Sequence, residues 1–365
     1  MTKERSTIGS QSPPNRNLPT SAYAVFEAGG DMGPFAIERR PTGQRDVLID
    51  IDFCGVCHTD YHYVMNSWGN AIYPVVPGHE IVGRVRAIGA AVTDLAVGQT
   101  VGVGCLVGSC GHCGACLDGE ESYCTDGLVL TYNSPTIDPG GITYGGFSRR
   151  ITVDRDFVLT LPATLDMAAA APLLCAGITT YSPLRHWNIG PGMHIGIIGL
   201  GGLGHVAVKI ARALGADVTV ITTTDRKRQD AERLGAKHCL VSSDQAAMSA
   251  AAASLDFLLN TVPVPHCFDP YLPLLKRDGV MCLVGAFGQT PSFDTNNINM
   301  QRRTVTGSFI GGLRETQEML DFCGAHGIVA DIELIPMQDI NLAFNRLITG
   351  QVGYRLVIDM SSLAE

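Results

Sequence analysis

A glycine-rich stretch, GLGGLG at residues 199–204, constrains the fold of this chain more than any other feature. It carries a G-x-G-x-x-G pattern, with an apolar strand-like run before it and an amphipathic helical pattern after it. In that setting glycines allow a tight turn and let the backbone approach a pyrophosphate, which then lies at the helix N-terminus. The alternative is a glycine-rich turn in an α/β protein that binds no such ligand. We favour a dinucleotide site that includes Gly199, Gly201, Gly202, Leu203 and Gly204.

The segment around this turn alternates between strand-like and helical patterns. Such alternation implies βαβ crossovers and a parallel sheet. The apolar runs lie at residues 193–199, 217–222, 255–262, 280–286 and 304–312, and the helical patterns at 203–215, 226–235 and 271–279.

The remainder of the chain has a different composition. Residues 21–165 are rich in Gly, Val and Pro, and short β-type runs alternate with turns, which is typical of an irregular, mostly β domain. A length of 365 residues suggests two domains. We expect a flexible tail over 1–20, a β-rich domain over 21–175 with a cysteine-rich lobe near 105–124, a dinucleotide-binding domain over 176–312, and a return to the first domain over 313–365.

The residues after the second strand of the dinucleotide segment select the cofactor. An enzyme that uses NAD usually carries an acid there, bonded to the adenosine ribose. In VITTTDRKR, Thr223 occupies that place, Thr222 and Thr224 flank it, and Arg228 follows. Hydroxyls and cations suit a 2′-phosphate, so the sequence favours NADP(H). Two points count against this: the basic run could be the solvated start of a helix, and Asp225 lies within it.

Charge and cysteine content exclude several classes of protein. The net charge is −9, which gives little support to nucleic-acid binding. The chain shows no apolar N-terminal run with a cleavage site, and the Ala-rich stretch at 168–176 is too short to cross a membrane. We therefore expect a cytoplasmic protein without a membrane partner. In that compartment, twelve cysteines favour metal binding over disulfides.

Four of these cysteines have the spacing of a metal site. Cys110, Cys113, Cys116 and Cys124 follow the pattern C-x2-C-x2-C-x7-C. Two-residue gaps let successive thiolates point inward, and four thiolates complete a tetrahedral zinc shell without an open position. We therefore predict a structural zinc site. A set of disulfides would require an oxidising compartment, and an iron–sulfur cluster uses the same ligands.

A second polar cluster, CGVCHTDYH at residues 54–62, allows three interpretations: a metal site, a redox pair or a crowded turn. A catalytic zinc needs three protein ligands and one open position. His79, Glu80 and Cys175 are further candidates, although a histidine can be a satisfied core residue and a single cysteine can be buried packing. A redox pair is disfavoured because this C-x-x-C lies outside the βαβ unit.

Together these motifs resemble the zinc-dependent medium-chain alcohol dehydrogenases, and within them the cinnamyl alcohol dehydrogenase branch. The matching stretches run in family order over roughly residues 21–360 and include CGVCHTDYH, YPVVPGHEIVGRV, PLLCAGITTYSPL and GSFIGG. The resemblance implies an α/β fold with an irregular β-rich GroES-like catalytic domain and a Rossmann domain with a doubly wound parallel sheet.

The resemblance also implies the metal ligands. Cys57, His79 and Cys175 match the three ligands of the catalytic zinc. Glu80 matches an acid beside the histidine ligand that can approach or bind zinc. Cys54 matches no ligand.

The other polar residues of the cluster match a proton relay. Thr59 matches the hydroxyl that bonds the substrate oxygen, and His62 the residue that carries the proton outward. Asp60 matches an acid that orients His79, and His58 matches a residue near the cofactor pyrophosphate.

The implied activity is reversible hydride transfer between NADP(H) and a primary alcohol or aldehyde, with two zinc ions per chain and a homodimer or tetramer. A family member that reduces iminium ions or activated alkenes is the alternative, but such branches tend to lose the zinc ligands or the relay. A zinc-binding module without enzymatic activity fits the acidic charge poorly. Val129 stands where the plant pattern has a bulky aromatic residue, so Trp68 and Phe309 are expected to line the pocket instead, and the substrate is an aromatic, allylic or aliphatic aldehyde.

Overall fold

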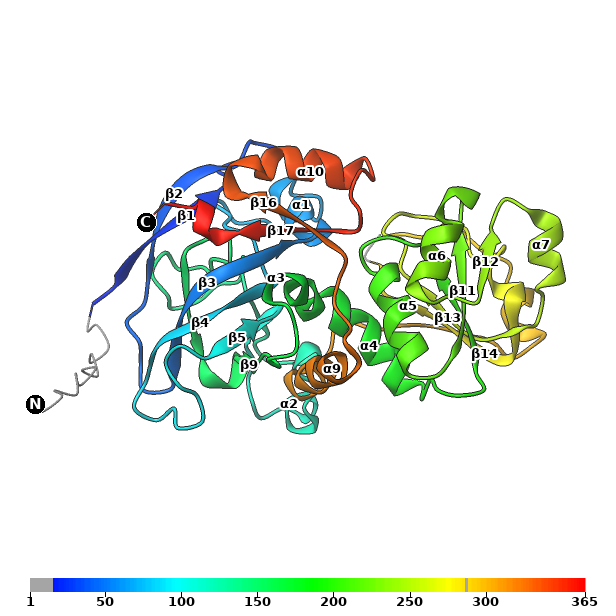
Figure 1. Ribbon diagram of the computed structural model, residues 1–365, viewed down its shortest axis with the longest axis horizontal. Helices are drawn as coiled ribbons and strands as arrows, with labels where there is room; N and C mark the ends of the chain where they lie inside the picture. The colour runs from blue at the N-terminus through cyan, green and yellow to red at the C-terminus, as the bar shows by residue number, and fades with distance from the viewer. Residues whose placement is uncertain (1–15, 286–287, 365) are drawn as a thin grey trace, which may run out of the picture.

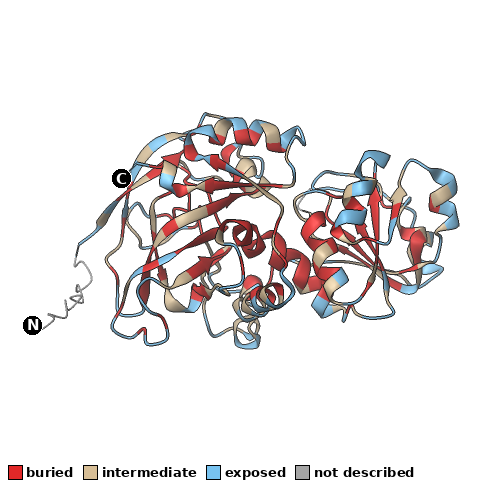
Figure 2. Ribbon diagram, in the orientation of Figure 1, coloured by how far each residue is buried: buried red, intermediate tan, exposed pale blue. Residues whose placement is uncertain are grey.

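The computed structural model describes residues 16–285 and 288–364, which form two lobes side by side (Figure 1). Most of the expected tail, residues 1–15, lies outside the described residues, and the first strand already begins at Leu18. In both lobes the buried residues follow the central strands and the elements between the lobes, while exposed residues lie on the outer helices and loops (Figure 2).

The second lobe contains a six-stranded sheet in which every strand pairs parallel to its neighbour, in the order β12-β11-β10-β13-β14-β15. The order reverses at β10, and ligands of doubly wound sheets bind at such a switch point. The strands are β10 (His194–Ile198), β11 (Asp217–Thr222), β12 (His238–Val241), β13 (Leu255–Asn260), β14 (Leu275–Leu283) and β15 (Thr304–Gly307). The helices are α5 (Gly204–Ala213), α6 (Arg228–Leu234), α7 (Gln245–Ala250) and α8 (Asn296–Asn299).

The parallel sheet is confirmed, but one expected helix is wrong. Residues 271–279 form a short 3-10 turn over Leu272–Leu274 and then the start of β14. Pro273 lies in this turn, and proline lacks the N–H that an interior helical position needs. Leu275 pairs with Leu255 of β13, so strand pairing takes over from the amphipathic pattern.

The first lobe is built on a seven-stranded sheet in the order β16-β17-β3-β4-β5-β9, with β8 beside β3. The long strand β3 is central because it pairs with β4, β8 and β17. The strands are β1 (Leu18–Ala24), β2 (Gly33–Arg39), β3 (Asp46–Val56), β4 (Ile81–Ile88), β5 (Thr100–Val103), β6 (Leu106–Gly108), β7 (Val129–Leu130), β8 (Arg150–Asp154), β9 (Leu159–Thr160), β16 (Ile332–Pro336) and β17 (Arg355–Asp359). Strands β16 and β17 bring the C-terminal segment back to this sheet (Figure 1).

Helices connect and cover this lobe. Helix α4 lies between the two sheets and is buried along most of its length (Figure 2). The helices are α1 (His58–Val64), α2 (Gly114–Asp118), α3 (Met167–Ala170), α4 (Ala176–His186), α9 (Leu313–His326) and α10 (Ile340–Ile348). Within the described part of the chain, no single helix has both the length and the apolar character needed to cross a membrane; the bent pair Met167–Leu174 and Ala176–His186 meets those criteria only jointly.

Candidate active site

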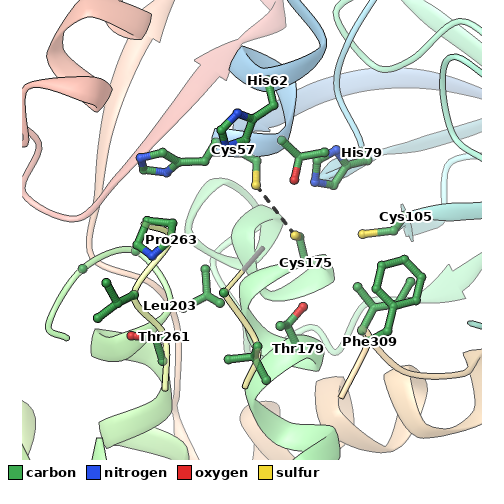
Figure 3. A pocket seen from close by; sticks show the side chains of 18 of the residues that line it. Cys57, His62, His79, Cys105, Cys175, Thr179, Leu203, Thr261, Pro263 and Phe309 are labelled. Carbon is green, nitrogen blue, oxygen red and sulfur yellow. Dashed lines mark hydrogen bonds between the residues drawn. The ribbon is translucent and has the colours of Figure 1, made fainter. Parts of the chain in front are cut away.

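A cavity of about 470 Å³ is lined by residues of both lobes (Figure 3). One wall comes from the segment that begins α1 and from the residues before β4. The opposite wall is the glycine turn after β10. Three of the metal-ligand candidates, Cys57, His79 and Cys175, therefore line one cavity with the glycine turn, although they are far apart in the sequence.

Four candidate metal ligands meet on the first wall. The ligand atoms of Cys57, His79, Glu80 and Cys175 all lie within 4.8 Å of one another, and the four residues are buried. The Sγ atoms of Cys57 and Cys175 are 3.9 Å apart (Figure 3). Two thiols, an imidazole and a carboxylate are donors that zinc prefers, and the cluster borders a cavity. The residues therefore fit a catalytic zinc ion.

The backbone determines how these ligands approach one another. Cys57 is the N-cap of α1, and Cys175 directly precedes α4. Gly55 of β3 leaves the space that Glu80 occupies, because a Cβ at position 55 would overlap the Glu80 carboxylate. Glycine is thus required at position 55 by close approach of a side chain.

Proton positions in the cluster follow from its charges. A hydrogen bond from the Cys175 thiol lowers the pKa of Cys57 well below its ordinary value, and His79 acts in the same direction. A lower pKa favours the thiolate of Cys57, which is the form that binds metal. Burial raises the pKa of Glu80 to about 7, although the charge of Arg355 acts in the opposite direction.

Arg355 is a site residue that the sequence analysis missed. It lies in β17, is 2% exposed, and forms a buried ion pair with Glu80. A Cβ on Gly202 would lie 3.0 Å from its Nη1 atom, so the same guanidinium also touches the glycine turn. An arginine within the apolar run YRLVIDM was the available signal, because a buried arginine needs a partner.

Asp60 ties the two ligand-bearing segments together. Its carboxylate accepts hydrogen bonds from the backbone N–H of Cys57 at 2.8 Å and of Gly78 at 3.0 Å. One carboxylate oxygen lies 3.5 Å from Nδ1 of His79. The structure therefore places Asp60 where an acid that orients His79 is expected.

The predicted relay residues line the cavity on α1. Thr59 and His62 are one turn apart, so they share a face of the helix. His62 Nδ1 is buried and has no hydrogen-bond partner among the described residues. Burial lowers the pKa of His62, which keeps its ring neutral and able to accept a proton at pH 7. His58 also lines the cavity.

The glycine turn forms the opposite wall. Gly199, with φ of +91°, Gly201, Gly202 and Leu203 line the cavity. Gly204 begins α5 and lies behind them, where a Cβ would overlap the carbonyl oxygen of Gly199.

None of the four residues predicted to select the cofactor lines the cavity. Thr222, Thr223, Thr224 and Arg228 are absent from its lining. Arg228 bonds to Asp225 at 2.8 Å and to the Cys239 carbonyl at 3.1 Å. Lys227, a cation of the same basic run, does line the cavity and donates to the Leu200 carbonyl at 2.7 Å.

The four-cysteine cluster lies apart from this cavity. The Sγ atoms of Cys110, Cys113, Cys116 and Cys124 are within 4.8 Å of one another. Backbone N–H groups donate to these sulfurs, for example from Cys113 to Cys110 Sγ at 3.3 Å and from Cys110 to Cys124 Sγ at 3.4 Å. All twelve cysteines are free, so none forms a disulfide. The donor set fits a structural zinc ion.

Aromatic and sulfur groups complete the cavity. Trp68 and Phe309 line it as predicted, whereas Val129 pairs with Gly108 in the β6-β7 hairpin and does not. Cys105 and Tyr132 line it without having been singled out from the sequence.

Comparison with known proteins agrees with this geometry. The chain matches the family models described as alcohol dehydrogenase GroES-like domain, at residues 43–163, and zinc-binding dehydrogenase, at residues 202–325. It is 52% identical to aldehyde reductase YahK of Escherichia coli K12, over 94% of this chain and 99% of that protein. It is 50% identical to NADP-dependent alcohol dehydrogenase C 1 of Mycolicibacterium smegmatis, over 94% and 98% of the two chains.

Solved structures show the same relationship. The cinnamyl alcohol dehydrogenase SbCAD4 of Sorghum bicolor superposes with a TM-score of 0.92 and 46% identity, over 95% of this chain and 99% of that one. CAD from Helicobacter pylori, complexed with NADP(H), has a TM-score of 0.89 and 38% identity, over 96% and 100%.

The fold and the site define a two-domain dehydrogenase: the chain belongs to the zinc-binding, medium-chain alcohol dehydrogenase family. Within that family it resembles the cinnamyl alcohol dehydrogenases and the related aldehyde reductases. It is therefore an oxidoreductase of the alcohol dehydrogenase and aldehyde reductase type. The alternative reduction of iminium ions or activated alkenes is not supported, and both the ligands and the relay residues are present.

Proposed function

We propose that this protein is a zinc-dependent aldehyde reductase that interconverts primary alcohols and aldehydes with NADP(H). The observation that carries the proposal is the buried cluster of Cys57, His79 and Cys175, with Glu80 beside it, on the cavity wall opposite the glycine turn. Zinc bound by these residues would supply Lewis acidity to the substrate oxygen. A nicotinamide cofactor along the glycine turn would supply the redox chemistry.

The residues of α1 handle the proton. The Thr59 hydroxyl binds the substrate oxygen and passes a proton to or from the imidazole of His62. Neutral His62 can accept that proton at Nδ1, which has no competing partner among the described residues. Asp60 holds the Cys57 and Gly78 segments in place and orients His79.

We propose that the enzyme prefers NADP(H) over NAD(H). Three features bear on this preference. Thr223 stands after β11 where an acid would repel a 2′-phosphate. Lys227 lies at the cavity beside Leu200 and is the cation best placed to meet a phosphate. Arg228 is already engaged by Asp225, so its contribution is smaller than the sequence alone suggests.

The lining of the cavity favours an uncharged, largely apolar aldehyde. Among the described lining residues there is no Asp, Glu or Arg, and the one lysine lies on the cofactor side. Trp68, Leu130, Phe309 and Ile310 provide apolar surface. Aromatic, allylic and aliphatic aldehydes all meet this requirement, whereas sugar acids and amino aldehydes do not.

Three further predictions complete the proposal. The chain holds a second, structural zinc at Cys110, Cys113, Cys116 and Cys124, and it is a cytoplasmic homodimer, with a tetramer as the alternative. Its domains are residues 21–175, 176–312 and the returning 313–365. Support for that return is the pairing of β17 with β3.

The proposal is tested by NADPH oxidation with a panel of aliphatic, aromatic and terpenoid aldehydes, run in parallel with NADH, after metal analysis of the purified protein. We expect activity with uncharged aldehydes, a preference for NADPH and about two zinc ions per chain. Absence of turnover with every aldehyde from a protein that holds zinc would overturn the proposed reaction.

A further inference from the structure

The orientation of His79 depends on more than Asp60. A metal-binding histidine usually has its ring held by neighbouring groups, and loss of such support weakens metal binding. His79 is 4% exposed, and on one side its Nδ1 faces Asp60 at 3.5 Å. On its face it meets the ring of Tyr132, with centroids 5.7 Å apart and planes 28° from parallel. Tyr132 therefore limits rotation of the imidazole.

Tyr132 is itself held in place. Directly before it, the Thr131 N–H donates to the Cys105 carbonyl at 3.0 Å and the Thr131 hydroxyl to the Gly104 carbonyl at 2.5 Å. The Tyr132 ring contacts the ring of Tyr63 of α1 edge to face, with centroids 5.1 Å apart. Directly after it, the Asn133 N–H donates to the Thr143 carbonyl at 2.9 Å. Because its backbone and the Tyr63 ring hold Tyr132 in place, Tyr132 can in turn restrict the imidazole of His79.

The Tyr132 hydroxyl has an unmet need for a partner. It is buried and makes no hydrogen bond to any described residue. Buried donors without a partner are rare and costly, so they usually mark a functional constraint.

We propose that Tyr132 is a positioning residue for the metal ligand His79, with its ring fixing the imidazole plane. The inference rests on the proposed catalytic zinc. It also connects the two cysteine clusters, because the chain runs from Cys124 through β7 directly to Tyr132.

The test uses cobalt(II) in place of zinc, since its visible absorption reports ligand geometry, together with the rate at which a chelator removes each metal. Tyr132→Leu removes the ring and should speed loss of the catalytic metal by about 10- to 100-fold, the range for lost support around a ligand. Its cobalt bands should shift. Tyr132→Phe keeps the ring, so the bands should stay near those of the unmodified protein and metal loss should rise by less than about tenfold.

The matched control is Tyr144→Leu, which removes another buried tyrosine whose ring meets Phe35 rather than a metal ligand. Release from the Cys110 cluster provides an internal reference in every variant. If Tyr132→Leu does not fold, Tyr132→Met replaces it. The inference is overturned if the unmodified protein holds two metal ions but Tyr132→Leu leaves the cobalt(II) absorption bands and the metal release rates unchanged. An unmodified protein without metal at Cys57 would overturn the proposed function as well.

Discussion

The two cysteine clusters present similar ligand atoms in opposite surroundings. Cys110, Cys113, Cys116 and Cys124 come from one short segment and are partly exposed, and their sulfurs accept hydrogen bonds from their own backbone. Cys57, His79 and Cys175 come from three distant segments, are buried, and border the cavity. We therefore expect the cluster that one segment assembles to serve folding, and the cluster that the whole fold assembles to remain open to a substrate.

The largest effect is expected from breaking the local cluster. Cys113→Ser removes one of four thiolates, and a structural zinc contributes its binding energy to folding. Loss of even about 4 kcal/mol would lower the melting temperature by roughly 10 °C, at about 2–4 °C per kcal/mol. Thermal unfolding followed by circular dichroism measures this. Cys267→Ser, at a half-buried cysteine outside both clusters, is the control and should unfold like the unmodified protein.

Breaking the cavity cluster should instead spare the fold. Cys57→Ser should lower the zinc content from about two to about one per chain and reduce turnover by about 10³-fold, because several kcal/mol of charge stabilisation are lost at 1.36 kcal/mol per factor of ten. Metal analysis and aldehyde reduction are the measurements. Cys54→Ser changes a neighbouring buried cysteine that is not in the cluster and should keep both zinc ions. An equal decrease in melting temperature for Cys57→Ser and Cys113→Ser would show that the two clusters do not differ in their contribution to stability.

The proposed relay sharpens the comparison, because its residues line the same cavity as Cys57, His79 and Cys175. Thr59→Ala removes the hydroxyl that transfers the proton, so turnover should fall by about 10²- to 10⁴-fold. Zinc content and melting temperature should stay unchanged. Thr59→Ser keeps a hydroxyl and should recover most of the rate, and His62→Ala should cost less than Thr59→Ala because water can replace the outer group. Full alcohol oxidation by Thr59→Ala would show that the proton leaves by another route.

The smallest effect is expected from residues near the glycine turn that select the cofactor. One charge-assisted bond to a phosphate is worth roughly 1.5–3 kcal/mol, which gives about 10- to 150-fold preference for NADPH over NADH. Lys227→Ala should raise the Michaelis constant for NADPH and leave that for NADH nearly unchanged. Arg228→Ala is the matched comparison and should do less, because Asp225 already engages Arg228. Thr223→Asp should reverse the preference, and equal efficiencies with both cofactors in the unmodified enzyme would contradict it.

The features that the sequence could predict are the local ones, and those that it could not predict depend on the whole fold. The four-cysteine spacing and the glycine turn are local patterns, so their geometry could be inferred without the fold. Cys175 could be named only through the family resemblance, because nothing near it indicates that it meets Cys57. Arg355 and Tyr132 were missed for the same reason: their partners, Glu80 and His79, are brought to them by strand pairing and chain return.

Secondary structure shows a related limit. The pattern at residues 271–279 resembles an amphipathic helix, yet the structure has a short turn and the start of β14. A strand inside a parallel sheet gains hydrogen bonds from neighbouring strands that local sequence does not reveal. The apolar run at residues 217–222 predicted the bounds of β11, but which cation reaches the cavity depended on side-chain contacts of Lys227 and Arg228.

The return of the C-terminal strands has a consequence for biosynthesis. Arg355 partners Glu80, and β17 pairs with the central strand β3, so the catalytic lobe lacks both until residues 355–359 have left the ribosome. The six-stranded sheet needs only the continuous segment 194–307 and can be completed earlier. Domains generally fold as units during synthesis. In this chain the second lobe can therefore fold before the first, and the catalytic site can close only after β17 has been synthesised.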